Sequence, residues 1–304
     1  MGLRGKYEPS HGLIKCIQWM GCIVLLFIPA MGCALLLPNP LSIDSLKWIQ
    51  FLQTASLFLL PPLCMAYLWS SKPVQWLGMR CTSSRTILYS VLLMLLALPA
   101  INLLSYMNQQ MSLPTFLEPI EAWMKAQEEN AAQLTEQFLQ VDTFGGLMIN
   151  LLLMAALPAI AEELTFRGVL MRLLGGKAMQ QEGNGDKVPH LAIWCSAILF
   201  SAIHMQFYGF VPRMLMGALF GYALAWTGSI WVPMLMHFTN NAMAVLLYFV
   251  AYRSHWDMEQ VDAIGTNDTL WLGVVSMIIT VVGIYAFRRS ITMSNASSRM
   301  SNGN

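Results

Sequence analysis

The stretch FGGLMINLLLMAALPAIAEELTFR, residues 144–167, decides the fold class of this chain. Residues 143–161 carry no Asp, Glu, Lys or Arg, and two glutamates follow them directly. A helix needs about 20 predominantly apolar residues to cross a bilayer. The stretch therefore predicts a membrane-spanning helix that leads into an acidic pair.

The composition of the whole chain agrees with a membrane protein. Of its 304 residues, 56% are hydrophobic and 11% are charged, whereas an ordinary soluble domain carries about 25% charged residues. The mean hydropathy is +0.54, and the formal net charge of +1 gives no basic surface for nucleic acid. We therefore exclude a soluble enzyme, a disordered protein and a nucleic-acid binder, and expect the lipid bilayer as a partner.

Further apolar runs of similar length lie on both sides of this stretch. They predict an all-α, polytopic membrane protein of about eight transmembrane helices. The predicted spans lie near residues 17–37, 48–69, 86–107, 144–166, 190–208, 213–228, 230–251 and 269–287. Gly228, between Thr227 and Ser229, marks the turn between the sixth and seventh spans.

Basic and acidic side chains are separated among the predicted loops. Lys and Arg collect in the N-terminal tail, in loops 70–85 and 167–189 and just after the last span, whereas loops 108–143 and 252–268 are acidic. Short cytoplasmic loops carry an excess of Lys and Arg. We expect a multi-pass protein of the bacterial inner membrane, with both termini in the cytoplasm.

Three parts follow one another along the chain. Residues 1–143 hold three spans and the acidic external loop, residues 144–251 hold spans four to seven, and residues 252–304 hold the last span and a polar tail. Within the acidic loop, residues 116–140 show a partial helical stripe. We expect there a helix on the membrane surface or, alternatively, a gate for the substrate.

The acidic pair offers one paired and one free carboxylate. On a helix, Glu163 and Arg167 are four residues apart, in the order that favours an ion pair. Glu162 points about 100° away from Glu163 and is left free for chemistry. Pro158 cannot donate a backbone hydrogen bond, so it frees the carbonyl of Met154 one turn earlier.

Two histidines and an asparagine extend this set. His204 follows Phe200 in the fifth span, and His237 and Asn241 share one face of the seventh. Glutamate can take a proton from water and return it to a leaving amine, while His and Asn donors can hold an oxyanion. We therefore expect peptide hydrolysis. Counting from the ends of the spans places Glu162 and His237 in the cytoplasmic half of the membrane, but His204 in the outer half.

Three motifs in this order resemble the signature motifs of the CPBP family, the type-2 CAAX processing and bacteriocin-processing intramembrane proteases. They are Glu162-Glu163-x-x-x-Arg167, Phe200-x-x-x-His204 and His237-x-x-x-Asn241. The resemblance implies an intramembrane endopeptidase that cleaves a membrane-associated or lipid-modified peptide with water activated by a glutamate. The catalytic residues it implies are Glu162, His204, His237 and Asn241, and the supporting residues are Glu163, Arg167 and Phe200.

Two other functions stay open. A zinc-dependent intramembrane metalloprotease would use Glu162, His204 and His237 as ligands, although the chain has no HExxH motif. A non-catalytic membrane scaffold, immunity protein or transporter would also place Glu, Arg and His inside the membrane. We expect no cofactor, with zinc as the alternative.

Overall fold

The computed structural model describes residues 3–176, 188–256 and 263–301, and every regular element in these ranges is helical. The α-helices are α1 (Gly12–Ala34), α2 (Ile43–Thr54), α3 (Leu60–Trp69), α4 (Pro73–Trp76), α5 (Ser84–Gln109), α6 (Glu118–Leu139), α7 (Phe144–Asn150), α8 (Leu157–Glu163), α9 (Met171–Gly175), α11 (His190–Ala202), α12 (Phe210–Thr227), α13 (Trp231–Ser254) and α15 (Leu270–Ser301). π-Helical stretches join α2 to α3, α7 to α8 and α8 to α9.

Six helical segments of the described chain are long and apolar enough to cross a membrane. They are Gly12–Ala34, Ile43–Trp69, Ser84–Gln109, Phe144–Gly175, Trp231–Ser254 and Asn267–Ser294. The other two predicted spans correspond to α11, which has only 13 residues, and to α12, an 18-residue helix that contains Arg213 and is not among the six. The chain is an all-α polytopic membrane protein, but α11 and α12 do not meet the criteria for a full span.

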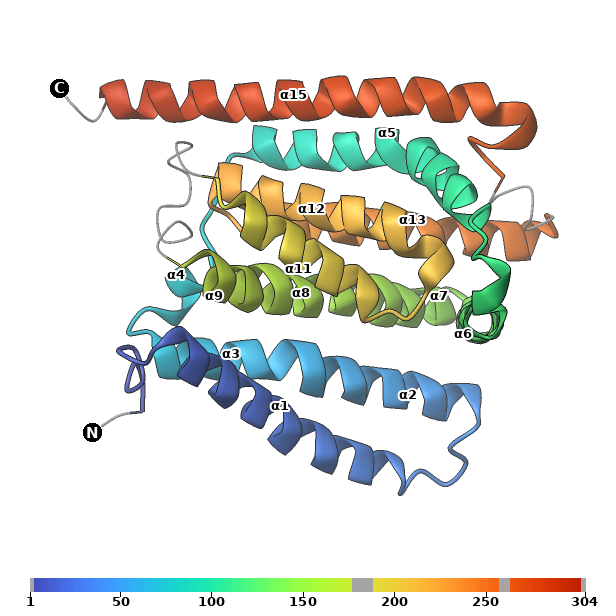
Figure 1. The fold of residues 1–304 in the computed structure, drawn as a ribbon, viewed down its shortest axis with the longest axis horizontal. Helices are drawn as coiled ribbons and strands as arrows, with labels where there is room; N and C mark the ends of the chain where they lie inside the picture. Colours follow the sequence, from blue (N-terminus) through green and yellow to red (C-terminus); the bar gives the residue numbers. More distant parts are fainter. Residues whose placement is uncertain (1–2, 177–187, 257–262, 302–304) are drawn as a thin grey trace.

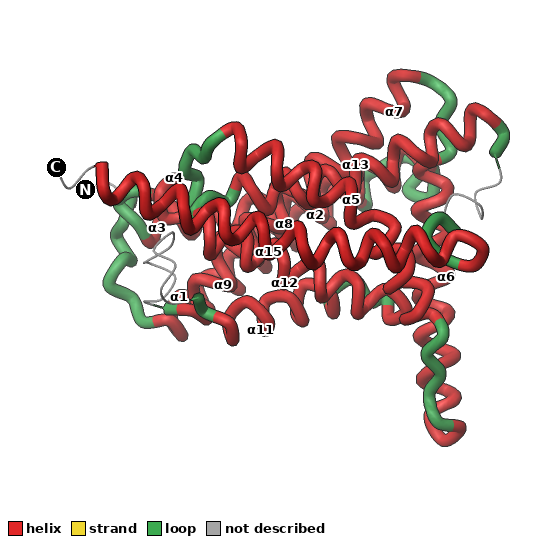
Figure 2. The backbone as a smooth tube through the Cα atoms, turned by 90° about the horizontal axis from the view of Figure 1, so that it is seen from above, coloured by secondary structure: helices red, strands yellow, loops and turns green. Residues whose placement is uncertain are grey.

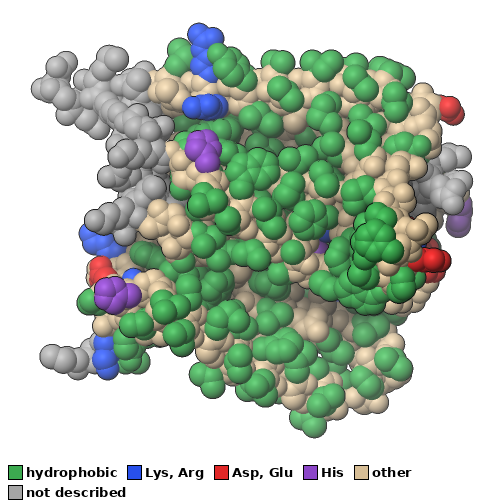
Figure 3. Space-filling view, viewed as in Figure 1, with side chains coloured by type: hydrophobic (Ala, Val, Ile, Leu, Met, Phe, Trp, Pro, Cys, Tyr) green, Lys and Arg blue, Asp and Glu red, His purple; other side chains and the backbone are tan. Residues whose placement is uncertain are grey.

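The long helices lie side by side in layers (Figure 1). Helices α5 and α15 pack together at one edge, α1 to α3 form the opposite edge, and the remaining long helices lie between them. Helix α1 begins and α15 ends at the same end of the bundle. On the face drawn in Figure 3, hydrophobic side chains cover the middle, most Lys and Arg lie toward that end, and most Asp and Glu lie at the other, although one acidic side chain lies among the basic ones. The bundle thus has a basic end and an acidic end.

The turn between α12 and α13 lies where the sequence predicted it. Gly228 has a φ of +67°, in the left-handed region that glycine adopts without strain, and its N–H caps α12 by donating to Leu224. Ser229 Oγ donates to the carbonyl of Arg80 at 2.6 Å. The turn is thereby fixed to the loop before α5, at the basic end of the bundle.

The fourth span is longer than the sequence predicted. Its helix continues through residue 166 to Gly175, so Glu162 lies near the middle of the span and not near its cytoplasmic end. The reason is that Glu163 and Arg167 are buried together and do not mark the membrane surface. Two π-helical stretches, Leu151–Ala156 and Leu164–Leu170, flank α8 within this span.

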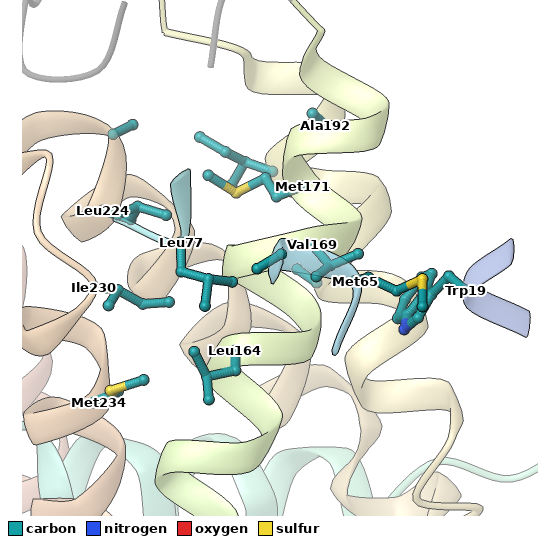
Figure 4. Packing of buried hydrophobic residues seen from close by; sticks show 14 of the residues in the cluster. Trp19, Met65, Leu77, Leu164, Val169, Met171, Ala192, Leu224, Ile230 and Met234 are labelled. Atoms are coloured by element: carbon teal, nitrogen blue, oxygen red, sulfur yellow. The ribbon is translucent and has the colours of Figure 1, made fainter. Parts of the chain in front are cut away.

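The first spans pack against this fourth span. Trp19 of α1 and Met65 of α3 lie on the side of Val169 in one cluster (Figure 4). In the same cluster, Leu77 lies beside Ile230, the residue before α13. All five side chains are at most 8% exposed. The N-terminal helices therefore form one continuous core with the segment that carries the acidic pair.

Helix α6 confirms the helix predicted within residues 116–140. It is seen end-on in Figure 1 and lengthwise in Figure 2, so it runs across the acidic end of the bundle and extends beyond it on the side of α11. The Trp123 ring lies 5.3 Å from that of Phe207, and Glu128 Oε2 accepts from the backbone N–H of Tyr208 at 3.1 Å. Helix α6 thus covers the turn that follows His204.

Candidate active site

Glu163 and Arg167 form a buried ion pair. Both side chains are 0% exposed, and Arg167 Nη1 donates to Glu163 Oε1 at 2.9 Å. Arg167 Nη2 donates to the carbonyl of Gly217 at 2.7 Å. The guanidinium carbon also lies 4.8 Å from the ring centroid of Phe200 and 5.4 Å from that of Phe220. The pair therefore joins the fourth span to α11 and α12.

His237 bridges the two glutamates. Its Nδ1 lies 3.0 Å from Glu163 Oε1, and its Nε2 lies 3.9 Å from Glu162 Oε2. Because a carboxylate paired with Arg167 is an acceptor only, Nδ1 carries the proton of this bond. Phe220 stacks on the imidazole with ring centroids 5.4 Å apart. The ring of His237 is thus held on its edge and on its face.

Glu162 is the freer of the two carboxylates. Its side chain is 14% exposed, against 0% for Glu163. Its Oε2 is buried and has no hydrogen-bond partner in the described protein. The 3.9 Å between this oxygen and His237 Nε2 exceeds hydrogen-bond length, so the histidine leaves the oxygen unsatisfied. A buried carboxylate oxygen without a partner is a place where a water or a substrate atom can bind.

His204 lies in the turn just after α11. Its Nδ1 is 2.7 Å from the carbonyl of Phe200, which can only accept, so Nδ1 carries a proton and the neutral ring leaves Nε2 as an acceptor. The Phe200 ring lies 5.2 Å from His204 and 5.8 Å from His237. The structure therefore brings His204 and His237 to the same ring, although the sequence placed them in different halves of the membrane.

Asn241 binds the backbone carbonyl that Pro158 was expected to free. Its Nδ2 donates to the Met154 carbonyl at 3.2 Å, and its Oδ1 accepts from Asn240 at 3.1 Å. The asparagine therefore fastens α13 to the fourth span. Asn241 lies four residues after His237 in α13, as expected, but its amide is bound to Met154 and Asn240 and not free for a substrate.

The described residues offer no ready metal site. Nowhere in the described ranges do three or more His, Cys, Asp or Glu side chains gather in a way that could hold a metal ion. The donors of the zinc alternative are Glu162, His204 and His237, and they do not form such a group. The zinc alternative therefore stays a prediction, which chelation of the purified protein would test.

Sequence reasoning missed Arg213 and Gln206. Arg213 Nη2 donates to Gln206 Oε1 at 2.6 Å, beside the turn that carries His204. The signal was present, because Arg213 is the single charged residue of α12. It was overlooked because it stands at the predicted start of a span, where a charge is usually solvated.

The comparison with known proteins covers the same part of the chain. Residues 144–243 match the family described as Rce1-like, type II CAAX prenyl endopeptidase Rce1-like. The uncharacterized protein YpbD of Bacillus subtilis (strain 168) is 28% identical over 98 residues, which is 31% of this chain and 43% of YpbD. No solved structure matches the chain. All three motifs lie within the matched segment, so this part of the chain is similar to the Rce1-like family of peptidases, and the chain spans less than half of the length of YpbD.

Proposed function

We propose that this chain is an intramembrane endopeptidase that hydrolyses peptide bonds of a membrane-associated or lipid-modified substrate. One observation carries the proposal. Both adjacent glutamates keep a buried Oε2 without a partner, but Oε1 of the fully buried Glu163 is engaged by Arg167 and His237, whereas the side chain of Glu162 is 14% exposed and can be reached by water. A general base needs such a free lone pair within reach of the proton that it removes.

The proposed reaction uses the protein's own groups. A water between Glu162 Oε2 and His237 Nε2 would bond to both across their 3.9 Å separation. Glu162 takes one proton from this water, and the hydroxide attacks the scissile carbonyl carbon. The carbonyl oxygen then carries the negative charge until the C–N bond breaks. The proton held by Glu162 goes to the leaving amine, which restores the carboxylate.

The histidines would orient the reactants. Glu163 fixes the tautomer of His237, so that its Nε2 faces the reacting water. His204 presents its own Nε2 as an acceptor, since Nδ1 is bonded to the carbonyl of Phe200. The proposed roles follow the motifs in the matched segment and the hydrogen bonds of the two rings.

The proposed orientation places the basic end of the bundle in the cytoplasm of a bacterium, with the inner membrane around the apolar belt. Lys and Arg collect at this end, as positive-inside loops do. Cys81 is exposed in the loop before α5, near that end. In a variant that keeps Cys81 as its single cysteine, an impermeant maleimide should leave Cys81 unlabelled in intact cells and label it after permeabilisation. Labelling of Cys81 in intact cells would indicate the opposite orientation.

The activity is tested with purified protein in detergent. A peptide library, with unmodified, farnesylated and palmitoylated members, is incubated with wild type, Glu162→Gln and His237→Ala, each with and without a chelator. Glu129→Gln is the matched control, because Glu129 is an exposed residue of α6 that bonds only Gln133. We expect wild type and Glu129→Gln to cleave the same peptides, and the other two variants to lose cleavage.

Each other outcome favours a different function. Loss of wild-type cleavage on chelation, restored by zinc, would transfer the assignment to a metalloprotease. Cleavage by Glu162→Gln at the wild-type rate would refute the proposed base. A wild-type protein that cleaves no peptide would favour the non-catalytic scaffold.

A further inference from the structure

Arg213 is a cation in an apolar helix without an acidic partner. It is the single Lys, Arg, Asp or Glu of α12, and its side chain is half-buried. Its hydrogen bonds go to Gln206, from Nη2 to Oε1 at 2.6 Å and from Nη1 to the backbone carbonyl at 3.4 Å. No carboxylate of the described chain lies within 4.0 Å of it. Charges at such places in membrane proteins usually serve function.

The helix face that carries Arg213 is turned toward the candidate active site. Gly217 is one turn further along α12, and its carbonyl accepts from Arg167. Phe220 is the next residue on this face and stacks on His237. Residues spaced by three and four lie on one side of a helix. Arg213 therefore faces the same space as the groups that hold the acidic pair and His237.

Arg213 also interacts electrostatically with the reacting groups. Its charge acts on Glu162 and on His204, and the charges of Glu128 and Glu162 act in turn on Arg213. Glu128 is itself bonded to the N–H of Tyr208. Arg167, by contrast, is neutralised by direct contact with Glu163. Arg213 is thus the cation near Glu162 that has no direct counter-ion.

Two of the expected oxyanion donors are engaged elsewhere. The proton of His204 Nδ1 goes to the carbonyl of Phe200, and the amide of Asn241 goes to the carbonyl of Met154. During hydrolysis, however, one negative charge leaves Glu162 and appears on the scissile carbonyl oxygen. In a site of low dielectric, that charge needs a fixed positive partner.

We infer that Arg213 is a further residue of the active site, which balances the negative charge as it moves from Glu162 to the carbonyl oxygen of the substrate. The inference rests on the proposed function. Gln206 orients the guanidinium through its side chain and its backbone carbonyl. The charge is conserved through the step: Glu162 becomes neutral as the oxyanion forms, and Arg213 faces one negative charge before and after.

The test separates charge from structure. Arg213→Lys keeps the charge but loses the forked contact with Gln206, whereas Arg213→Gln loses the charge and can still hydrogen-bond. Arg253→Gln, at the end of α13 where the arginine contacts Phe249, is the matched control. Each variant is assayed on the best peptide of the library, for kcat, KM and inhibition by a phosphinic analogue of that peptide, whose tetrahedral group is anionic.

Arg213→Gln should lower kcat about 100-fold with little change in KM, as removal of an oxyanion donor does. The phosphinic analogue should bind about 100-fold more weakly to Arg213→Gln than to wild type. The peptide substrate, measured in the inactive Glu162→Gln background so that it is not cleaved, should bind equally well with and without Arg213→Gln. Arg213→Lys should retain about a tenth of wild-type kcat, and Arg253→Gln all of it.

Three results would overturn the inference without touching the proposed function. The first is a wild-type kcat in Arg213→Gln, and the second is an equal loss of kcat in Arg213→Lys and Arg213→Gln. The third is unchanged inhibition of Arg213→Gln by the phosphinic analogue. Helix content and the thermal midpoint in detergent show whether a variant is folded; equal losses with a lowered midpoint assign Arg213 a structural role. Full activity of Glu162→Gln would instead refute the proposed function itself.

Discussion

Replacing Arg167 with methionine would remove a fully buried guanidinium while keeping most of the side-chain volume. The change breaks the 2.9 Å bond to Glu163 and the 2.7 Å bond to the Gly217 carbonyl. A hydrogen bond to a charged group contributes about 1.5–3 kcal/mol, and a buried carbonyl without a donor costs about 1–3 kcal/mol. We therefore expect the free energy of unfolding to fall by about 3–5 kcal/mol, the range for breaking a buried ion pair.

The assay is unfolding in mixed micelles with increasing SDS, followed by far-ultraviolet circular dichroism and tryptophan fluorescence. Arg85→Met is the control, because Arg85 is exposed, and we expect a change of at most about 0.5 kcal/mol. The double variant Glu163→Gln/Arg167→Met leaves no unpaired charge, so it should be more stable than the single arginine variant. A coupling energy of about 2 kcal/mol is expected for groups in contact. A loss below 1 kcal/mol, or strictly additive losses, would refute a stabilising buried pair.

Three further predictions concern packing, a backbone anchor and pH. Gly217→Ala would bring a Cβ within 3.1 Å of a neighbouring ring and 3.3 Å of the α11 backbone, so stability should fall by about 1–3 kcal/mol; an unchanged SDS midpoint would contradict this. Asn241→Leu should lower stability by about 1 kcal/mol because the Met154 carbonyl loses its donor, whereas a fall in kcat alone would give Asn241 a direct catalytic role. The hydrogen bond from Lys125 lowers the pKa of Glu121 below its usual 4.5, so the stability that Glu121 adds to α6 is present above that value and is lost as pH falls through its lowered pKa. Hydrogen exchange in α6 should therefore rise only in strong acid, and Glu121→Gln should abolish this dependence.

The arrangement of the spans was largely predictable, because apolar length and loop charge are properties of the sequence. The end of the fourth span was not. The prediction paired Glu163 with Arg167 but placed the pair at the end of the span, since charges inside a membrane are costly. In the structure they neutralise each other inside the protein, and the helix continues to Gly175. Partners from other helices, the Gly217 carbonyl of α12 and His237 of α13, complete the hydrogen bonding of the buried pair, and no pattern in the sequence shows these contacts.

The predicted end of the fifth span, residue 208, was wrong for a different reason. Residues 190–208 carry no Asp, Glu, Lys, Arg, Gly or Pro, so composition gives no sign of where the helix stops. It stops at Ala202, and Met205 adopts a left-handed φ of 54° in the turn that follows. Contacts from distant helices hold this turn: Asn108 of α5 donates to the carbonyl of Phe207 at 3.1 Å. Such long-range contacts determine a turn that local propensity cannot predict.

Within the candidate site, spacing identified what a single helix determines. The pairing of Glu163 with Arg167 follows from four residues of separation. The bonds from His237 to Glu163 and from Asn241 to Met154 join different spans, and the sequence contains no register between spans. The roles proposed for these side chains therefore depend on packing as much as on motif.

The two π-helical stretches around α8 make the fourth span sensitive to the number of its residues. An α-helix turns about 100° per residue, whereas a π-helical stretch accommodates one additional residue in a turn. Deleting one residue from Leu151–Ala156 or from Leu164–Leu170 would let that stretch relax to an ordinary α-helix. The helix on one side of the deletion would then be rotated relative to the helix on the other side. Because α8 lies between the two stretches, the orientation of Glu162 depends on both of them. Such a deletion would remove no motif but would rotate Glu162 relative to the part of the span beyond the deletion. A second deletion in the other stretch would not restore the arrangement, because each stretch sets the angle of Glu162 against a different part of the span.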